Sequence, residues 1–153
     1  MNEKAYDGRT VIADMVEGCA GLVEHPIAIK ALRAVCRYFG GQLIYIPMTK
    51  TTGDTTGELH GVLVDAVGDA AGEKILDKIM TLFGGVQIYI PMERGAFRDV
   101  IAREIYERYD GNKARIRDLC REYGMSFVQV YRLWAEGRDN KMQGVFDFEG
   151  EER

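Results

Sequence analysis

The strongest constraint on the fold of this chain is a ten-residue phrase that its sequence contains twice. FGGQLIYIPM begins at Phe39, and FGGVQIYIPM begins at Phe83. A shift of 44 positions superposes identical residues at 39–41 and 44–48, and it also carries Lys30 onto Lys74. Self-similarity at a fixed period is the signature of a repeated structural unit. The simplest explanation is a duplication.

Each copy is predicted to fold as two helices followed by a short strand. Apolar residues recur at helical spacing over 11–23 and 29–39 in the first copy, and over 59–67 and 75–83 in the second. Pro26 suits the first turn of a helix, and Asp69 suits an N-cap. The glycine pair then stops the helix, and alternating isoleucines over 42–46 and 86–90 indicate half-buried strands.

Two short strands are marginal without partners, so we expect these two to pair antiparallel over the four helices. The predicted fold class is mainly α with short β-strands, in which tandem helix-helix-strand units form a pseudo-dimeric core. An ordinary helical domain of two consecutive layers is the alternative. The duplicated dimerisation-type domain would span 1–92, with copies at about 9–48 and 55–92 joined by the connector TKTTGDTTG.

Residues 93–138 are predicted to form a helix-turn-helix domain, followed by an acidic, disordered tail over 139–153. An apolar stripe from Phe97 to Tyr106 ends at a breaker, Asp110-Gly111-Asn112. Two more helices then meet at a short glycine turn, which is typical of a helix-turn-helix. The residues that fill the crossing, the turn and the buried positions are Cys120, Gly124, Met125, Val130 and Leu133.

The distribution of charge supports this assignment. The net charge of −4 argues against a nucleic-acid binder when it is taken as an average. However, residues 94–138 hold 10 Lys and Arg against 7 Asp and Glu, so the segment with the helix-turn-helix pattern is locally basic.

The last helix, from about Ser126 to Glu136, is predicted to enter the major groove of DNA. Its first turns would present Ser126, Val128, Gln129 and Arg132 to base edges, with Gln129 suited to adenine and Arg132 to guanine or a phosphate. A solvated surface residue is the alternative for each arginine. We expect Phe127, Tyr131 and Trp134 to pack rather than read bases. The residues predicted to contact the DNA backbone are Lys113, Arg115, Arg117, Arg121 and Tyr131.

The second phrase and the predicted helix-turn-helix resemble the Mor family of transcription activators, the middle-operon regulators of Mu-like phages. The resemblance covers roughly residues 70–135. Its motifs are Gly84-Gly85-x-x-x-Tyr89-Ile90-Pro91 and Tyr123-Gly124-Met125-Ser126-Phe127-x-x-Val130-Tyr131-Arg132.

This resemblance implies a homodimer in which N-terminal helices and strands form the interface and two helix-turn-helices grip adjacent major grooves. It places Gly84, Gly85, Gln87 and Tyr89 near the intervening minor groove. It also implies double-stranded DNA and bacterial RNA polymerase as partners. The start of the sequence has neither the apolar centre nor the cleavage site of a signal peptide, so we expect the protein in the cytoplasm of a bacterial cell, whether a phage, a prophage or the host uses it.

Duplication leaves the mode of self-association open. The chain could be a pseudo-dimeric monomer that reads one half-site, or a homodimer that reads an inverted repeat. A rival from another class is an interaction protein that docks onto a regulator or onto polymerase with little DNA binding of its own. We expect no enzyme, cofactor, metal site or membrane span, because the sequence contains no P-loop, GxGxxG motif, close pair of metal ligands or long apolar run.

Overall fold

The structure is a computed structural model that describes residues 8–50 and 54–151, with side chains described for 11–50 and 55–143. The chain divides into two compact units, residues 1–96 (unit 1) and 97–153 (unit 2). The predicted boundary at residue 92 falls just before α5 (Glu93–Ala96), a short helix that contacts α1 and α2 and so belongs to unit 1. Within the described residues, no helix is both long and apolar enough to cross a membrane.

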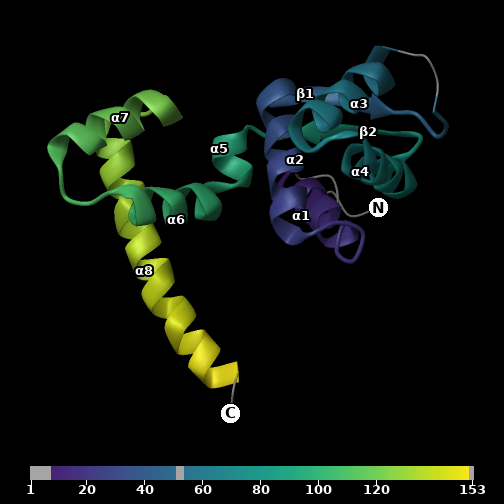
Figure 1. Ribbon diagram of the computed structural model, residues 1–153. Helices are drawn as coiled ribbons and strands as arrows, with labels where there is room; N and C mark the ends of the chain where they lie inside the picture. Colours follow the sequence, from purple (N-terminus) through teal and green to yellow (C-terminus); the bar gives the residue numbers. More distant parts are fainter. Residues whose placement is uncertain (1–7, 51–53, 152–153) are drawn as a thin grey trace. The chain divides into compact units, whose positions relative to one another are not determined.

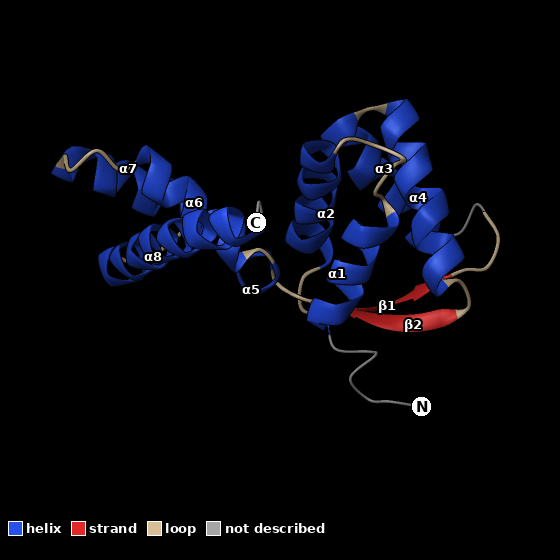
Figure 2. Ribbon diagram, turned by 90° about the horizontal axis from the view of Figure 1, so that it is seen from below, coloured by secondary structure: helices blue, strands red, loops and turns tan. Residues whose placement is uncertain are grey.

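Unit 1 combines four longer helices with a two-stranded sheet (Figure 1). The strands β1 and β2 pair antiparallel, as predicted, with Ile44 directly opposite Ile88. Figure 2 shows this sheet along one side of the four helices. In chain order the elements are α1 (Gly8–Gly18), α2 (His25–Phe39), β1 (Gln42–Ile46), α3 (Asp54–Val67), α4 (Asp69–Phe83) and β2 (Val86–Ile90).

The sheet has one buried face and one open face. Its four isoleucines, at 44, 46, 88 and 90, belong to the core of unit 1. Because successive side chains of a strand point to opposite faces, Leu43, Tyr45 and Tyr89 lie on the other face. They are 62%, 54% and 41% exposed. Unit 1 therefore presents an aromatic and apolar surface to solvent.

The two glycine pairs join helix to strand in the same way. Gly41 and Gly85 both have φ of 83°, a left-handed conformation that favours glycine. The backbone N–H of Gly41 donates to the carbonyl oxygen of Ile90 (2.7 Å), and that of Gly85 donates to the carbonyl oxygen of Ile46 (2.6 Å). Each glycine thus ties the start of its own strand to the end of the other strand.

Two details of the predicted boundaries are corrected. The N-cap of α4 is Gly68, with φ of 91°, and Asp69 is the first residue of the helix rather than its cap. A carboxylate in the first turn still stabilises the helix through the helix dipole. The second half of the predicted connector belongs to α3, which begins at Asp54, and residues 51–53 of the connector lie outside the described residues.

Unit 2 contains three helices, α6 (Arg98–Arg108), α7 (Lys113–Tyr123) and α8 (Phe127–Glu151), within the part of the chain that the structure describes. Its core includes Ile101 and Ile105 from α6, Ile116 from α7 and Val130 from α8. Figure 1 shows α6 crossing α8, with α7 near the start of α8. The three helices therefore share one small core.

The helix α8 is longer than predicted. It passes through the expected end at Glu136 and the segment predicted to be a tail, and it continues to Glu151. Gly137 explains why the helix does not stop there, because it is buried against α6. A Cβ at this position would lie 2.3 Å from the carbonyl oxygen of Ala102. Glycine is needed for this close approach and not for a helix end.

Candidate nucleic-acid interface

The turn between α7 and α8 has the geometry of a helix-turn-helix. The side chain of Asn112 caps α7 by accepting a hydrogen bond from the backbone N–H of Ala114 (2.9 Å). At the other end, Gly124 adopts a left-handed conformation with φ of 62° and ψ of 40°. Met125 follows it and is buried in the core of unit 2. The predicted glycine turn and the buried residue after it are confirmed.

A capping box starts α8 and involves two residues that were predicted to read bases. The backbone N–H of Gln129 donates to Oγ of Ser126 (3.2 Å), and the backbone N–H of Ser126 donates to Oε1 of Gln129 (3.1 Å). This reciprocal pair satisfies two backbone donors of the first turn. Only the amide nitrogen of Gln129 is then available to donate to another group.

The outward face of α8 is centred on Val128. Successive helix residues are rotated by about 100°. Val130 and Leu133, which are 0% and 3% exposed, mark the side that packs on the core. Val128 lies on the opposite side and is 65% exposed. Arg132 is exposed one turn later on nearly the same side. The structure therefore brings two of the predicted reading residues together on one face.

Exposed cations form a stripe along α7. Lys113, Arg117 and Arg121 are all exposed and follow at intervals of four residues, so they share one side of the helix. Arg115 lies apart from the stripe, near Glu122, where the hydrogen bond from Arg108 and then the charge of Arg115 lower the pKa of the Glu122 carboxyl. Among the residues that the structure describes, none of these four cations forms an ion pair. The stripe is therefore available to a polyanion.

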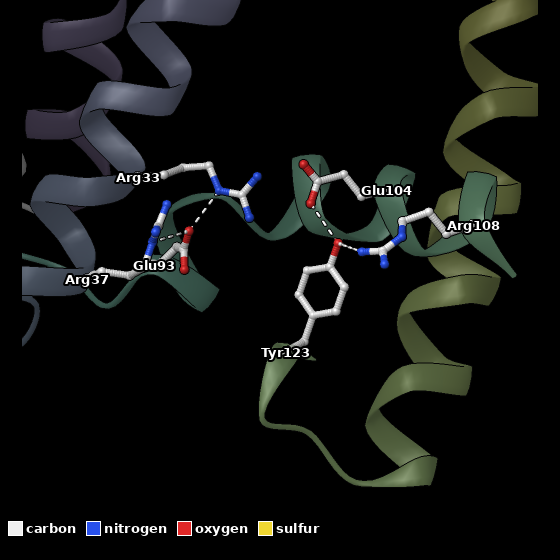
Figure 3. A network of polar contacts seen from close by, with 6 residues as sticks. All are labelled: Arg33, Arg37, Glu93, Glu104, Arg108 and Tyr123. Carbon is white, nitrogen blue, oxygen red and sulfur yellow. Dashed lines mark hydrogen bonds and ion pairs between the residues drawn. The ribbon is translucent and has the colours of Figure 1, made fainter. Parts of the chain in front are cut away.

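A polar network that the sequence did not reveal holds α7 against α6 (Figure 3). The hydroxyl of Tyr123 donates to Oε1 of Glu104 (2.9 Å) and accepts from Nη1 of Arg108 (3.2 Å). Arg108 also donates to both carboxylate oxygens of Glu122. Burial and then the bond to Glu104 raise the pKa of Tyr123. The only available signal was the spacing of four residues between Glu104 and Arg108 on α6.

The aromatic residues of α8 whose side chains the structure describes divide into two groups. Tyr131 and Trp134 both make edge-to-face contacts with Tyr109, with ring centroids 6.0 Å apart in each case. Trp134 packs as expected. Phe127 does not, because it is 49% exposed and lies outside the buried core.

The predicted DNA-proximal strand residues belong to unit 1. Gln87 and Tyr89 are exposed on the open face of the sheet. Gly84 has a local packing role, since a Cβ at this position would lie 3.2 Å from the Cα of Met48. Gly85 provides the left-handed turn described above. Both glycines thus have structural reasons to be glycine.

Comparison with known proteins supplies the identity that the geometry alone leaves open. No curated protein and no solved structure matches the chain. Residues 51–144 match the model of the Mor transcription activator family, whose members are not enzymes. The match spans more than half of the chain and includes β2, the helix-turn-helix and the described cations of α7. The chain therefore belongs to the Mor transcription activator family, and it is a DNA-binding regulator of transcription.

Proposed function

We propose that this protein is a sequence-specific activator that reads the major groove of double-stranded DNA with the first turns of α8 and recruits bacterial RNA polymerase. The observation that carries the proposal is the outward face of α8 in a chain of this family. Val128 and Arg132 share that face, opposite the buried core. A recognition helix needs such a face, free of packing and fixed by its other side.

Each reading residue has a distinct role in this proposal. Arg132 donates to a guanine or to a phosphate, and Gln129 uses its free amide nitrogen to donate to a base acceptor. Ser126 fixes the start of the helix through the capping box. Tyr131, whose ring makes an edge-to-face contact with Tyr109, contacts the DNA backbone. Val128 supplies an apolar contact.

The stripe on α7 contacts phosphates, with Arg115 as a fourth and weaker contributor. Each phosphate contact releases counterions, so the logarithm of affinity falls with the logarithm of salt by about 0.9 per contact. Replacing Arg117 with alanine is expected to reduce this slope by the share of about one phosphate contact. It is also expected to weaken binding to all DNA sequences by the same factor. Arg103→Ala is the matched control, since Arg103 is an exposed arginine on α6. An equal effect of both variants would refute the stripe as the phosphate contact.

We further propose that unit 1 is a duplicated, pseudo-dimeric dimerisation core. Three observations support this. The helices α2 and α4 each have 15 residues. The strands pair about Ile44 and Ile88, which are 44 positions apart. The hydrogen bonds that Gly41 and Gly85 donate are equivalent, because each runs from the start of one copy's strand to the end of the other copy's strand. A pseudo-two-fold axis between the central isoleucines relates each of these features.

Charge at the ends of the strands favours pairing between unlike copies over pairing between two first copies. Arg33 on α2 pairs with Glu93 after β2 (2.7 Å), and Asp77 on α4 pairs with Lys50 after β1 (2.8 Å). Arg33 and Asp77 are 44 positions apart, whereas Lys50 and Glu93 are 43 positions apart, so the two bridges occupy similar but not identical places in the two copies. Two first copies would oppose Lys50 to Arg33, whereas in two second copies Asp77 would face Arg94, which is the equivalent of Lys50.

The chain is therefore proposed to be a monomer with one helix-turn-helix, in which the two copies of the duplicated unit pair with each other. Sedimentation equilibrium tests this directly. A single species of 17.2 kDa across a wide range of protein concentration is the expected result. A dimer at the lowest concentration would refute the monomer and would mean that each complex contains two helix-turn-helices.

The test of DNA reading is selection of a randomised duplex pool on the purified chain at near-physiological salt. One short half-site is the expected product. An enriched inverted repeat would support sequence-specific DNA binding and would refute the monomer with one helix-turn-helix. Transcription by purified bacterial RNA polymerase from a promoter that carries the selected site then tests activation, and an unchanged transcript level would refute recruitment.

A second candidate is supported by the open face of the sheet. Leu43, Tyr45 and Tyr89 are exposed there, and Met48 and Met92, which follow the two strands, are 75% and 60% exposed. Aromatic residues and methionine are enriched at protein interfaces. In this alternative unit 1 docks onto another regulator or onto polymerase. No enrichment in the selection, together with capture of such a partner, would favour it. With DNA reading intact, Gln87 and Tyr89 are instead proposed to lie near the DNA.

A further inference from the structure

The first turn of α8 exposes two apolar side chains that are consecutive in the sequence. Phe127 is 49% exposed and Val128 is 65% exposed, while Val130 on the same helix is fully buried. Neither exposed residue contributes to the buried core of unit 2. Adjacent apolar side chains at the start of a recognition helix are unexpected for a surface that only carries charge.

The charged surroundings indicate what covers this patch. Arg132 is exposed one turn beyond Val128, and the stripe on α7 adds further cations to the same unit. A partner that fits must be anionic at its rim and apolar at isolated points between. The major groove of DNA has this character, because phosphates border it and the C5-methyl of thymine is the apolar group that an unmodified base pair presents there.

We propose that Phe127 and Val128 read thymine methyl groups at neighbouring positions of the target half-site. The inference rests on the proposed DNA-reading function and adds the chemical class of base that α8 selects. Val128 is suited to this role because a β-branched side chain has little rotamer freedom to lose on contact. The capping box of Ser126 and Gln129 fixes the turn that carries both residues.

Uracil substitution isolates the methyl group from every other property of the base. In the selected duplex, thymines are replaced by uracil one at a time, and the dissociation constant is measured by fluorescence anisotropy at constant salt. Uracil at one or two positions is expected to weaken binding about fourfold each, the effect of one buried methyl group. Specific binding that tolerates uracil at every thymine would overturn the proposal and leave the proposed function intact.

Variants assign the methyl groups to side chains. Val128→Ala is expected to weaken binding of the thymine duplex and to abolish the penalty of uracil at one position, and Phe127→Ala is expected to do the same at another. Met142→Ala is the control, because Met142 is an equally exposed residue of α8, four turns beyond the patch. Circular dichroism checks that each variant is folded. Full retention of the uracil penalty in both variants would refute the assignment, and loss of all sequence selection in the unmodified chain would refute DNA reading itself.

Discussion

Substitution of Gly137 by alanine should destabilise unit 2, although alanine is the better helix former. The added Cβ would lie 2.3 Å from the carbonyl oxygen of Ala102 and 2.8 Å from the Cβ of Tyr106. Neither atom can swing away as the end of a flexible side chain does, so α6 and α8 must separate.

The magnitude follows from two opposing effects. Overpacking of this kind costs about 1 to 3 kcal/mol, and the backbone obstacle places Gly137 near the upper limit. Alanine recovers up to about 1 kcal/mol through helix propensity. We therefore expect a loss of about 2 kcal/mol in the free energy of unfolding, or roughly 10 °C in the melting temperature of a unit of this size.

Trp134 is a suitable probe, because it is the only tryptophan of the chain and packs against Tyr106 and Tyr109 in unit 2. Urea unfolding followed by its fluorescence measures the loss. Gly61→Ala, followed by circular dichroism, is the matched control, since no atom lies within 4 Å of a Cβ at Gly61. That change should stabilise unit 1 by up to about 1 kcal/mol. If Gly137→Ala also stabilises its unit, the proposed close contact between helices is refuted.

Three further predictions concern single side chains. At pH 8, iodoacetamide should modify the partly exposed Cys120 and spare Cys36, because burial raises the pKa of the Cys36 thiol to about 12; peptide mass spectrometry would refute this by finding Cys36 modified first. Tyr123→Phe removes the hydroxyl that donates to Glu104 and should cost unit 2 about 1 kcal/mol in urea unfolding, whereas an unchanged midpoint would show that the network adds nothing. Arg98 on α6 donates hydrogen bonds to Glu136 and lowers the pKa of that carboxyl below the ordinary 4.5, so the stabilisation from this pair is present above pH 4.5 and is lost as the pH falls further. Glu136→Gln should reduce the loss of unfolding free energy at acid pH, by no more than about 0.5 kcal/mol because the pair is exposed. Identical dependence of the unfolding free energy on pH in the variant and the unmodified chain would refute the effect.

Local sequence patterns predicted the elements of this protein well. The strands at 42–46 and 86–90 have the predicted bounds, because alternating isoleucines between a glycine pair and a proline leave little choice. The turn at Gly124 was equally clear, since a helix stop, a buried Met125 and a capping serine occur in succession. These features depend only on neighbours in the sequence.

Long-range contacts were beyond such patterns. In the sequence, a glycine at position 137 is typical of the end of a helix. In the structure, Gly137 lies where α6 and α8 cross, and only the tertiary contact explains why the residue is glycine. The bridge between Arg33 and Glu93 joins residues 60 positions apart. Exposure of Phe127 could not be inferred, because the pattern of an apolar residue at a helix start is the same whether or not a neighbouring element covers it.

Pairing of β1 with β2 inside one chain changes how the core responds to dilution. When two separate chains supply the strands, the sheet comes apart below the dissociation constant of the dimer. Here the tether keeps the strands at a fixed local concentration, so the sheet forms in a unimolecular step. The melting temperature of unit 1 should not depend on protein concentration. The fraction of chains with an assembled core would then be the same for a few molecules in a cell as in a concentrated solution.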